Sequence, residues 1–208
     1  IASLDPVPRG EPEAHLGLQL RAPSFLVTYH PVTLEVDGGR AAMRALLQAV
    51  NALAGSAVLT GANADPGASE IRAAMRAFAK ANQGRVVLVE SLGARRYLSL
   101  MHYVDAVVGN SSSVLLGAPA VGGPTVDIGP RQKGRLRAPS VLHCGEGEKE
   151  IRRALEQAIS PAHRALVAKR DTPYGRPGAA RRIVDVLQAV EIRSPGKPFV
   201  DRRCAADA

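Results

Sequence analysis

The sequence is poor in aromatic residues: Phe, Tyr and Trp make up 3% of its 208 residues, and Trp is absent. The hydrophobic share of 46% still permits a core, which Ala, Val, Leu and Ile must build. The shortage of aromatic rings argues against a stacking surface for single-stranded nucleic acid. The net charge of +8 and the pI of about 10.1 favour an anionic partner. We therefore expect a phosphate-bearing ligand and no nucleic-acid partner.

Cysteine is also scarce, and its placement excludes two classes of protein. The two cysteines, Cys144 and Cys204, lie far apart and form no CxxC pair. No disulfide framework or zinc-binding pattern follows from them, and we expect no metal and no cofactor. The sequence shows neither a signal peptide nor a long apolar segment, so we expect a cytoplasmic protein without a membrane partner.

Composition divides the chain into three parts. Residues 1–23 are rich in Pro, Gly and charge, which is typical of a linker with one helical turn. Residues 24–190 carry regular hydrophobic patterns and are expected to form the folded domain. Residues 191–208 are rich in Pro, Lys and Arg, and we expect a flexible tail. Because the chain begins with Ile1 rather than Met, we expect a processed chain or a piece of a longer protein.

The folded part alternates between short apolar runs of strand length and segments with helical periodicity. Strands are expected at residues 25–29, 56–60, 85–89, 105–108, 124–128 and 140–144. Helices are expected at 40–53, 68–81, 95–101, 149–159 and 179–189, with others starting at the serines 111–113 and at Pro161. One strand and one helix recur roughly every thirty residues, which predicts an α/β fold with a doubly wound parallel sheet.

Polar residues follow five of the predicted strands. They are His30, Asn63 with Asp65, Glu90 with Ser91, the turn 110–113, and the loop that holds Arg131. Taken singly, each has a structural explanation, since a histidine after a strand is usually structural and NADPG is a good turn sequence. The ends of parallel strands share one edge of a sheet, where ligands bind. The convergence of polar residues there favours a site over five unrelated loops.

The turn after the fourth strand suits an anion. Ser111, Ser112 and Ser113 stand at a helix start, where hydroxyl groups cap backbone N–H groups and the helix dipole attracts negative charge. Four cations follow the fifth strand: Arg131, Lys133, Arg135 and Arg137. The pair of features predicts a phosphate or diphosphate site. A serine-capped helix beside a solvated basic loop remains the alternative.

Several motifs together resemble one enzyme family. They are FLVTYHPVTLE (25–35), NADPG (63–67), ESLGARRYLSLM (90–101), VVGNSSS (107–113), AP (118–119), GPRQKGR (129–135) and PYG (173–175). The set resembles the UDP-N-acetylglucosamine 2-epimerase family, in its hydrolysing, sialic-acid-pathway form, over roughly residues 15–200. The resemblance implies a GT-B-like fold of two Rossmann-like domains, of which this chain matches the carboxyl-terminal one. It also implies an amino-terminal domain ahead of the linker and a homo-oligomer.

The resemblance assigns roles to particular residues. It implies a catalytic role for His30, and it places Asn63 and Asp65 on a loop facing the sugar. It places Ser111, Ser112 and Ser113 at the diphosphate of UDP or a UDP-sugar, and Arg131 near the nucleotide.

The implied reaction is elimination of UDP from UDP-N-acetylglucosamine to give a 2-acetamidoglucal. Addition of water then releases N-acetylmannosamine. The carboxylates that remove the C2 proton come mainly from the amino-terminal domain in this family. We therefore expect no activity from this chain alone.

The chain departs from the family pattern GNSSSG-x-x-E-A-P at two positions. Val114 replaces a glycine beside the turn, and Gly117 replaces the glutamate that holds the ribose hydroxyls. A hydrogen bond to a charged group contributes about 1.5–3 kcal/mol, so uridine affinity is expected to fall by roughly one to two orders of magnitude. The departures support an alternative, a degenerate, non-catalytic sugar-nucleotide-binding module. A GT-B glycosyltransferase donor domain is the second alternative.

Overall fold

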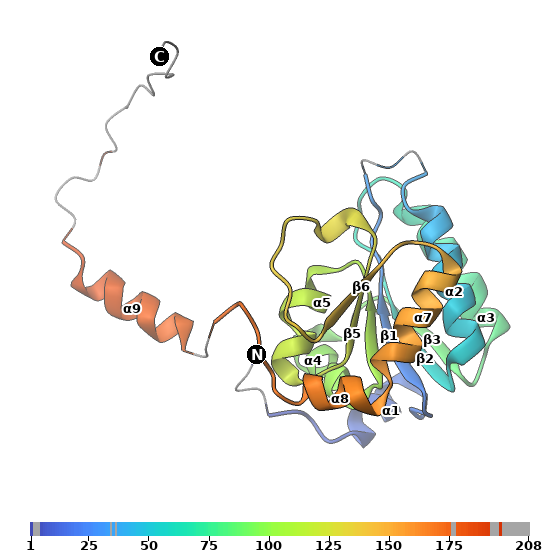
Figure 1. Cartoon of the computed structure of the whole chain (residues 1–208), viewed down its shortest axis with the longest axis horizontal. Helices are drawn as coiled ribbons and strands as arrows, with labels where there is room; N and C mark the ends of the chain where they lie inside the picture. Colours follow the sequence, from blue (N-terminus) through green and yellow to red (C-terminus); the bar gives the residue numbers. More distant parts are fainter. Residues whose placement is uncertain (2–4, 34, 36, 176–177, 192–195, 197–208) are drawn as a thin grey trace, which may run out of the picture. The chain divides into compact units, whose positions relative to one another are not determined.

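The computed structural model describes residues 1, 5–33, 35, 37–175, 178–191 and 196 (Figure 1). The chain divides into two compact units, Ile1–Gly175 and Arg176–Ala208. The first unit holds the sheet and its covering helices, and the second holds helix α9 (Ala179–Ala189). Most of the predicted tail, residues 191–208, falls outside the described residues.

The first unit is built on a six-stranded sheet whose neighbouring strands all run parallel. Its strands are β1 (Ser24–Thr28), β2 (Ser56–Thr60), β3 (Val86–Val89), β4 (Ala106–Gly109), β5 (Thr125–Ile128) and β6 (Val141–Cys144). The order across the sheet is β3-β2-β1-β4-β5-β6. This confirms the predicted doubly wound parallel sheet. The order reverses between β1 and β4, and such switch points are where open α/β sheets bind ligands.

Helices cover both faces of this sheet (Figure 1). One face carries α2 (Arg40–Leu53), α3 (Ala68–Ala81) and α7 (Glu148–Ala158), and α8 (Pro161–Val167) follows α7. The opposite face carries α1 (Gly10–Leu16), α4 (Gly93–Tyr103), α5 (Ser112–Leu116) and α6 (Ala118–Val121). A short 3₁₀ turn, η1 (Pro130–Gln132), follows β5 in the predicted basic loop.

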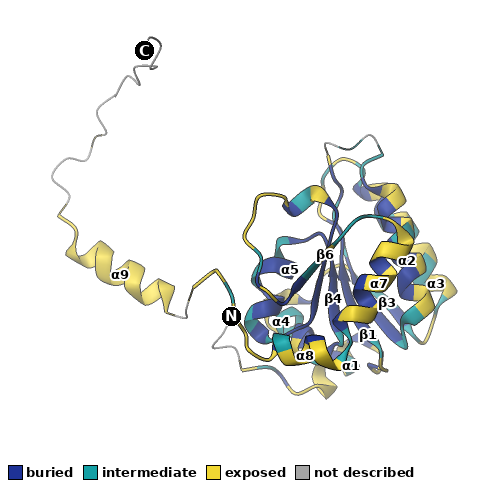
Figure 2. Cartoon of the chain, viewed as in Figure 1, coloured by how far each residue is buried: buried dark blue, intermediate teal, exposed yellow. Residues whose placement is uncertain are grey.

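The core follows the alternation of side chains along buried strands. On β1, Phe25 and Val27 pack in the cluster under α2, whereas Leu26 packs in the cluster under α4. All five residues of β1 and of β2 are buried, as expected for strands covered on both faces (Figure 2). Aliphatic side chains therefore fill both layers, in line with the low aromatic content.

The amino-terminal segment carries a helix and several buried aliphatic side chains. Its described part forms α1 and belongs to the first unit, where it buries Val7, Leu16, Leu18 and Leu20. The backbone N–H of Val7 donates to the Ser99 hydroxyl at 3.1 Å, and the Tyr103 hydroxyl donates to the Val7 carbonyl at 2.7 Å. The leucines in this Pro- and Gly-rich stretch supply apolar surface that packs beside α4.

No helix within the described ranges has both the length and the apolar character needed to cross a membrane.

Candidate functional site

Asn110 ties together the chain segments that leave three neighbouring strands. Its side chain is fully buried. Its Oδ1 accepts from the backbone N–H of His30 at 2.7 Å, and its Nδ2 donates to the His30 carbonyl at 2.8 Å. Its own carbonyl accepts from Arg131 Nη1 at 3.1 Å and from Gln132 Nε2 at 2.7 Å. The exits of β1, β4 and β5 are thereby fixed to one another at the switch point.

His30 presents a neutral ring to this edge of the sheet. The backbone N–H of Asn63 donates to His30 Nδ1 at 3.2 Å. Burial lowers the pKa of His30 from 6.5, the positive charge of Arg131 lowers it further, and Asp65 opposes them. The imidazole is therefore neutral at pH 7, with its proton on Nε2 because Nδ1 accepts a hydrogen bond. In this state His30 offers a ligand a hydrogen-bond donor.

The serine turn forms the expected helix cap. The helix that it caps is too short for its dipole to attract an anion strongly. Ser111 Oγ accepts from the backbone N–H of Ser113, and α5 contains five residues. Gly117 separates α5 from the four-residue α6. A helix dipole scales with the aligned peptide units, so one turn contributes little. Hydroxyl groups define this site more than the dipole does.

A pocket of about 320 Å³ opens beside the serine turn. Six hydroxyl-bearing residues line it: Thr28, Thr60, Ser91, Tyr97, Ser111 and Ser113. Residues 90–94, which leave β3, form the rest of its wall together with Gly61. The sequence pointed to Glu90 and Ser91 as a strand exit. It gave no reason to single out Tyr97, whose helix follows that exit.

A second pocket, of about 500 Å³, lies at the exits of β1 and β5. Asp65, Arg131, Glu35 and Lys133 are the charged residues in its wall. Burial first, and then the charge of Asp37, raises the pKa of Glu35. We call this the acidic–basic pocket, and the one beside the serine turn the hydroxyl pocket.

Four of the seven predicted site residues line these two pockets. Ser111 and Ser113 line the hydroxyl pocket, whereas Asp65 and Arg131 line the acidic–basic pocket. His30 and Asn63 are joined by the hydrogen bond at Nδ1, and Asn63 Nδ2 donates to Asp65 at 2.5 Å. Ser112 lines neither pocket. Arg131 reaches the serine turn through the Asn110 carbonyl.

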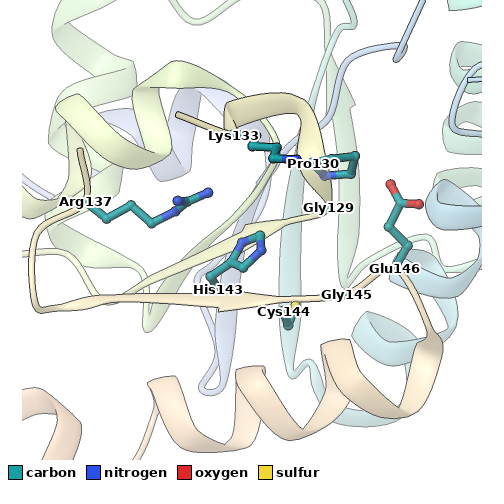
Figure 3. A pocket seen from close by; sticks show the side chains of 8 residues that line it. All are labelled: Gly129, Pro130, Lys133, Arg137, His143, Cys144, Gly145 and Glu146. Atoms are coloured by element: carbon teal, nitrogen blue, oxygen red, sulfur yellow. The ribbon is translucent and has the colours of Figure 1, made fainter. Parts of the chain in front are cut away.

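A third pocket, of about 450 Å³, lies at the exits of β5 and β6 (Figure 3). Arg137 and His143 extend toward each other there. Both bind the fully buried Asp127 of β5, whose Oδ2 accepts from Arg137 Nε at 2.9 Å, from Arg137 Nη2 at 2.8 Å and from His143 Nδ1 at 3.1 Å. The Arg137 charge is therefore compensated inside the protein. Of the four cations predicted to attract an anionic ligand, Arg131, Lys133 and Arg135 therefore remain.

The two departures from the family pattern face the core. Val114 is fully buried in the cluster under α4 and does not line the hydroxyl pocket. Its side chain therefore points away from the pocket beside the serine turn. A Cβ on Gly117 would lie 3.0 Å from the Ser113 carbonyl oxygen and 3.3 Å from Met101 Sδ. A side chain at position 117 would thus be in close steric contact with α4 from its Cβ outward.

The described part of the chain contains no group of three or more His, Cys, Asp or Glu side chains arranged to hold a metal ion.

An all-parallel sheet with this strand order, and pockets at its switch point, defines the Rossmann-like class of α/β domains. A family model described as UDP-N-acetylglucosamine 2-epimerase matches residues 9–188. The chain belongs to the UDP-N-acetylglucosamine 2-epimerase family.

Individual relatives agree with this assignment. The chain is 36% identical over 131 residues to the GDP/UDP-N,N'-diacetylbacillosamine 2-epimerase (hydrolyzing) of Campylobacter jejuni, covering 62% of this chain and 34% of that protein. It is 28% identical over 179 residues to a polysialic acid biosynthesis protein of Escherichia coli, covering 85% and 45%. The chain therefore spans less than half the length of these relatives.

Solved structures support the fold. UDP-GlcNAc 2-epimerase from Neisseria meningitidis, bound to UDP-GlcNAc, superposes with a TM-score of 0.61 at 19% identity, over 86% of this chain and 47% of that one. The lipopolysaccharide glycosyltransferase WaaG superposes with a TM-score of 0.55 at 14% identity, over 88% and 51%. The shared architecture is thus that of one half of a two-domain GT-B-like protein.

Proposed function

We propose that this chain is the nucleotide-binding part of a hydrolysing UDP-N-acetylglucosamine 2-epimerase. Such an enzyme converts UDP-N-acetylglucosamine and water into N-acetylmannosamine and UDP. Family membership and the relatives named above support the proposal. The observation that carries it is the hydroxyl pocket at the switch point, flanked by His30 and the Arg131 turn. This place and these donors suit the diphosphate of a UDP-sugar.

In this proposal the residues of the chain bind the nucleotide and assist the departure of UDP from the sugar. The serine turn, Ser111 to Ser113, holds the diphosphate, with the Ser111 hydroxyl as its donor from the hydroxyl pocket, and Arg131 supplies a positive charge at the same turn. Elimination breaks the bond from C1 of the sugar to a phosphate oxygen, which takes the electron pair. The Nε2–H of neutral His30 can donate to that oxygen as its charge develops. Asn63 and Asp65, on the next loop, face the sugar.

The proton on C2 of the sugar must be removed by a base that this chain does not supply. We assign that role to carboxylates of an amino-terminal domain that closes over the site, in a protein that is a homo-oligomer. The chain alone is then expected to bind UDP but not to release it from UDP-N-acetylglucosamine at about 1 s⁻¹, an ordinary enzymatic rate. Turnover at that rate by the isolated chain would contradict this division of roles.

The alternative of a non-catalytic module is favoured by one observation, the absence of a ribose-binding carboxylate at Gly117. It predicts UDP binding as well. It differs in predicting no UDP release even when the chain is joined to a family amino-terminal half.

Calorimetric titration of UDP tests the site itself. Wild-type protein should bind UDP, and Arg131→Ala should bind it about tenfold more weakly or worse, since a hydrogen bond to a charged group is lost. Arg153→Ala is the matched control, because it removes the same charge from an exposed position on α7. Equal affinity of the wild type and Arg131→Ala would show that the nucleotide does not bind at this turn.

A further inference from the structure

Five of the hydroxyl groups that line the hydroxyl pocket form a continuous row. Thr60 Oγ1 lies 2.9 Å from Thr28 Oγ1, which lies 2.8 Å from the Tyr97 hydroxyl. The Tyr97 hydroxyl lies 2.8 Å from Ser113 Oγ, and Ser113 Oγ lies 3.0 Å from Ser111 Oγ. The row runs from β2 through β1 and α4 to the serine turn. Each member lines the same pocket.

Counting protons fixes the direction of the row. Each hydroxyl has one proton and two lone pairs. The geometry of the last contact makes Ser113 the donor to Ser111. With the Ser113 proton used, Tyr97 must donate to Ser113, Thr28 to Tyr97 and Thr60 to Thr28.

The competing position for the Thr60 proton is the Val27 carbonyl, at 3.3 Å. Because Ser113 already donates to Ser111, a Thr60 that donated to Val27 would leave one of the other three contacts in the row without a proton between its two oxygens. Thr60 therefore donates to Thr28 rather than to the more distant Val27 carbonyl, and every hydroxyl proton in the row points toward Ser111.

Ser111 ends the row with its own proton unused. Its Oγ accepts from the Ser113 hydroxyl at 3.0 Å and from the Ser113 backbone N–H at 3.4 Å, which occupies both lone pairs. Among the described residues no acceptor contacts its proton, and the side chain lines the pocket. Hydrogen bonds that point the same way along a chain polarise one another. Ser111 can thus only donate to a ligand, and it is a stronger donor than an isolated serine.

We propose that Tyr97 is a positioning residue that acts through Ser113 to make the Ser111 hydroxyl a dedicated hydrogen-bond donor to a phosphate oxygen of the ligand. The inference rests on the proposed nucleotide site and adds a means by which a one-turn helix binds an anion. Burial raises the pKa of Tyr97, so its phenol keeps the proton that the row needs at neutral pH.

Ligand titrations separate this role from simple packing. Tyr97→Phe keeps the ring and removes one hydroxyl, and it should weaken UDP binding about 2- to 12-fold, the range of one net hydrogen bond. Uridine, which has no phosphate, should bind the variant as well as the wild type. Tyr103→Phe is the matched control, because its hydroxyl donates to the Val7 carbonyl away from the pocket. Equal weakening of UDP and uridine would overturn the proposal.

A double-mutant cycle tests the path through Ser111. In a Ser111→Ala background, Tyr97→Phe should cause no further loss of UDP affinity, since the terminal donor is already gone. Independent, additive losses would overturn the proposal.

Nuclear magnetic resonance tests the direction of the row without a ligand, using tyrosine labelled with ¹³C at Cζ. Ser113→Ala removes the acceptor of the Tyr97 proton and should move the Tyr97 Cζ signal upfield. Thr28→Val removes the donor to the phenol oxygen and should move it downfield. Shifts of the opposite signs would show that the row runs the other way and would overturn the proposal. A wild type that fails to bind UDP would instead overturn the proposed function, while these shifts still decide the direction.

Discussion

Replacing Asn110 with alanine should destabilise the protein far more than a polar residue in a turn normally does. The substitution leaves the backbone N–H and carbonyl of His30 without their partners at 2.7 and 2.8 Å, in a place from which the Asn110 side chain excludes water. An unsatisfied buried group costs about 1–3 kcal/mol, so two of them cost roughly 2–6 kcal/mol. That is a large part of the 5–15 kcal/mol by which a domain of this kind is stable.

Urea unfolding at pH 7 measures this loss as a change in midpoint at constant slope. Asn63→Ala is the matched control, because this asparagine is exposed and its side chain donates a hydrogen bond to the Asp65 carboxylate. The control should change the free energy of unfolding by less than about 0.5 kcal/mol. A loss below about 1 kcal/mol for Asn110→Ala would refute the reasoning, since it would mean that water or a shifted backbone satisfies His30.

Three other outcomes follow from the structure. The lowered pKa of His30 means that the unfolded chain binds more protons than the folded one below about pH 6.5. The free energy of unfolding should therefore fall as pH drops from 6.5 through the lowered pKa, and His30→Gln should lack that part of the slope in urea titrations at several pH values. Arg137→Met leaves Asp127 buried with only an imidazole partner and should cost about 3 kcal/mol in thermal unfolding, most of which Asp127→Asn should restore in the double variant. Gly117→Ala gains little in helix propensity, because position 117 caps both α5 and α6, and it brings a Cβ to 3.0 Å from the Ser113 carbonyl oxygen and 3.3 Å from Met101 Sδ. We expect no net gain in melting temperature, and a clear rise would show that Met101 yields.

The local sequence pattern was sufficient to predict the helices and strands and their arrangement in a parallel sheet. The helices at 40–53 and 68–81 and the strand at 56–60 have the predicted bounds, because apolar spacing and flanking glycines mark them in the sequence. The convergence of strand exits also followed, since a parallel sheet leaves no other place for them. The described part of segment 1–23 packs in the first unit because its leucines supply apolar surface among the prolines and glycines.

The contacts inside the site could not be predicted in the same way. Asn110 binds His30 across 80 residues, and Tyr97 binds Thr28 across 69, so no local spacing reveals either pair. Arg137 looked like a further ligand-binding cation in the sequence. Its partner Asp127 lies in a buried strand between Val126 and Ile128, and nothing in the sequence shows that the two side chains meet. Which side chains are already paired inside the protein depends on the packing of the whole sheet.

The reversal of strand order at the site has a consequence for how the domain folds. The β1–β2 pair joins residues 32 positions apart, such as Ser24 and Ser56, whereas the β1–β4 pair joins Phe25 to Ala106 across the whole first half of the sheet. Closing the longer segment costs more chain entropy, and such non-local contacts slow folding. The hydroxyl row and the Asn110 bonds both cross this seam. A ligand bound there would bridge the two halves of the sheet and, by binding only the folded state, would hold its most entropically costly pairing in place.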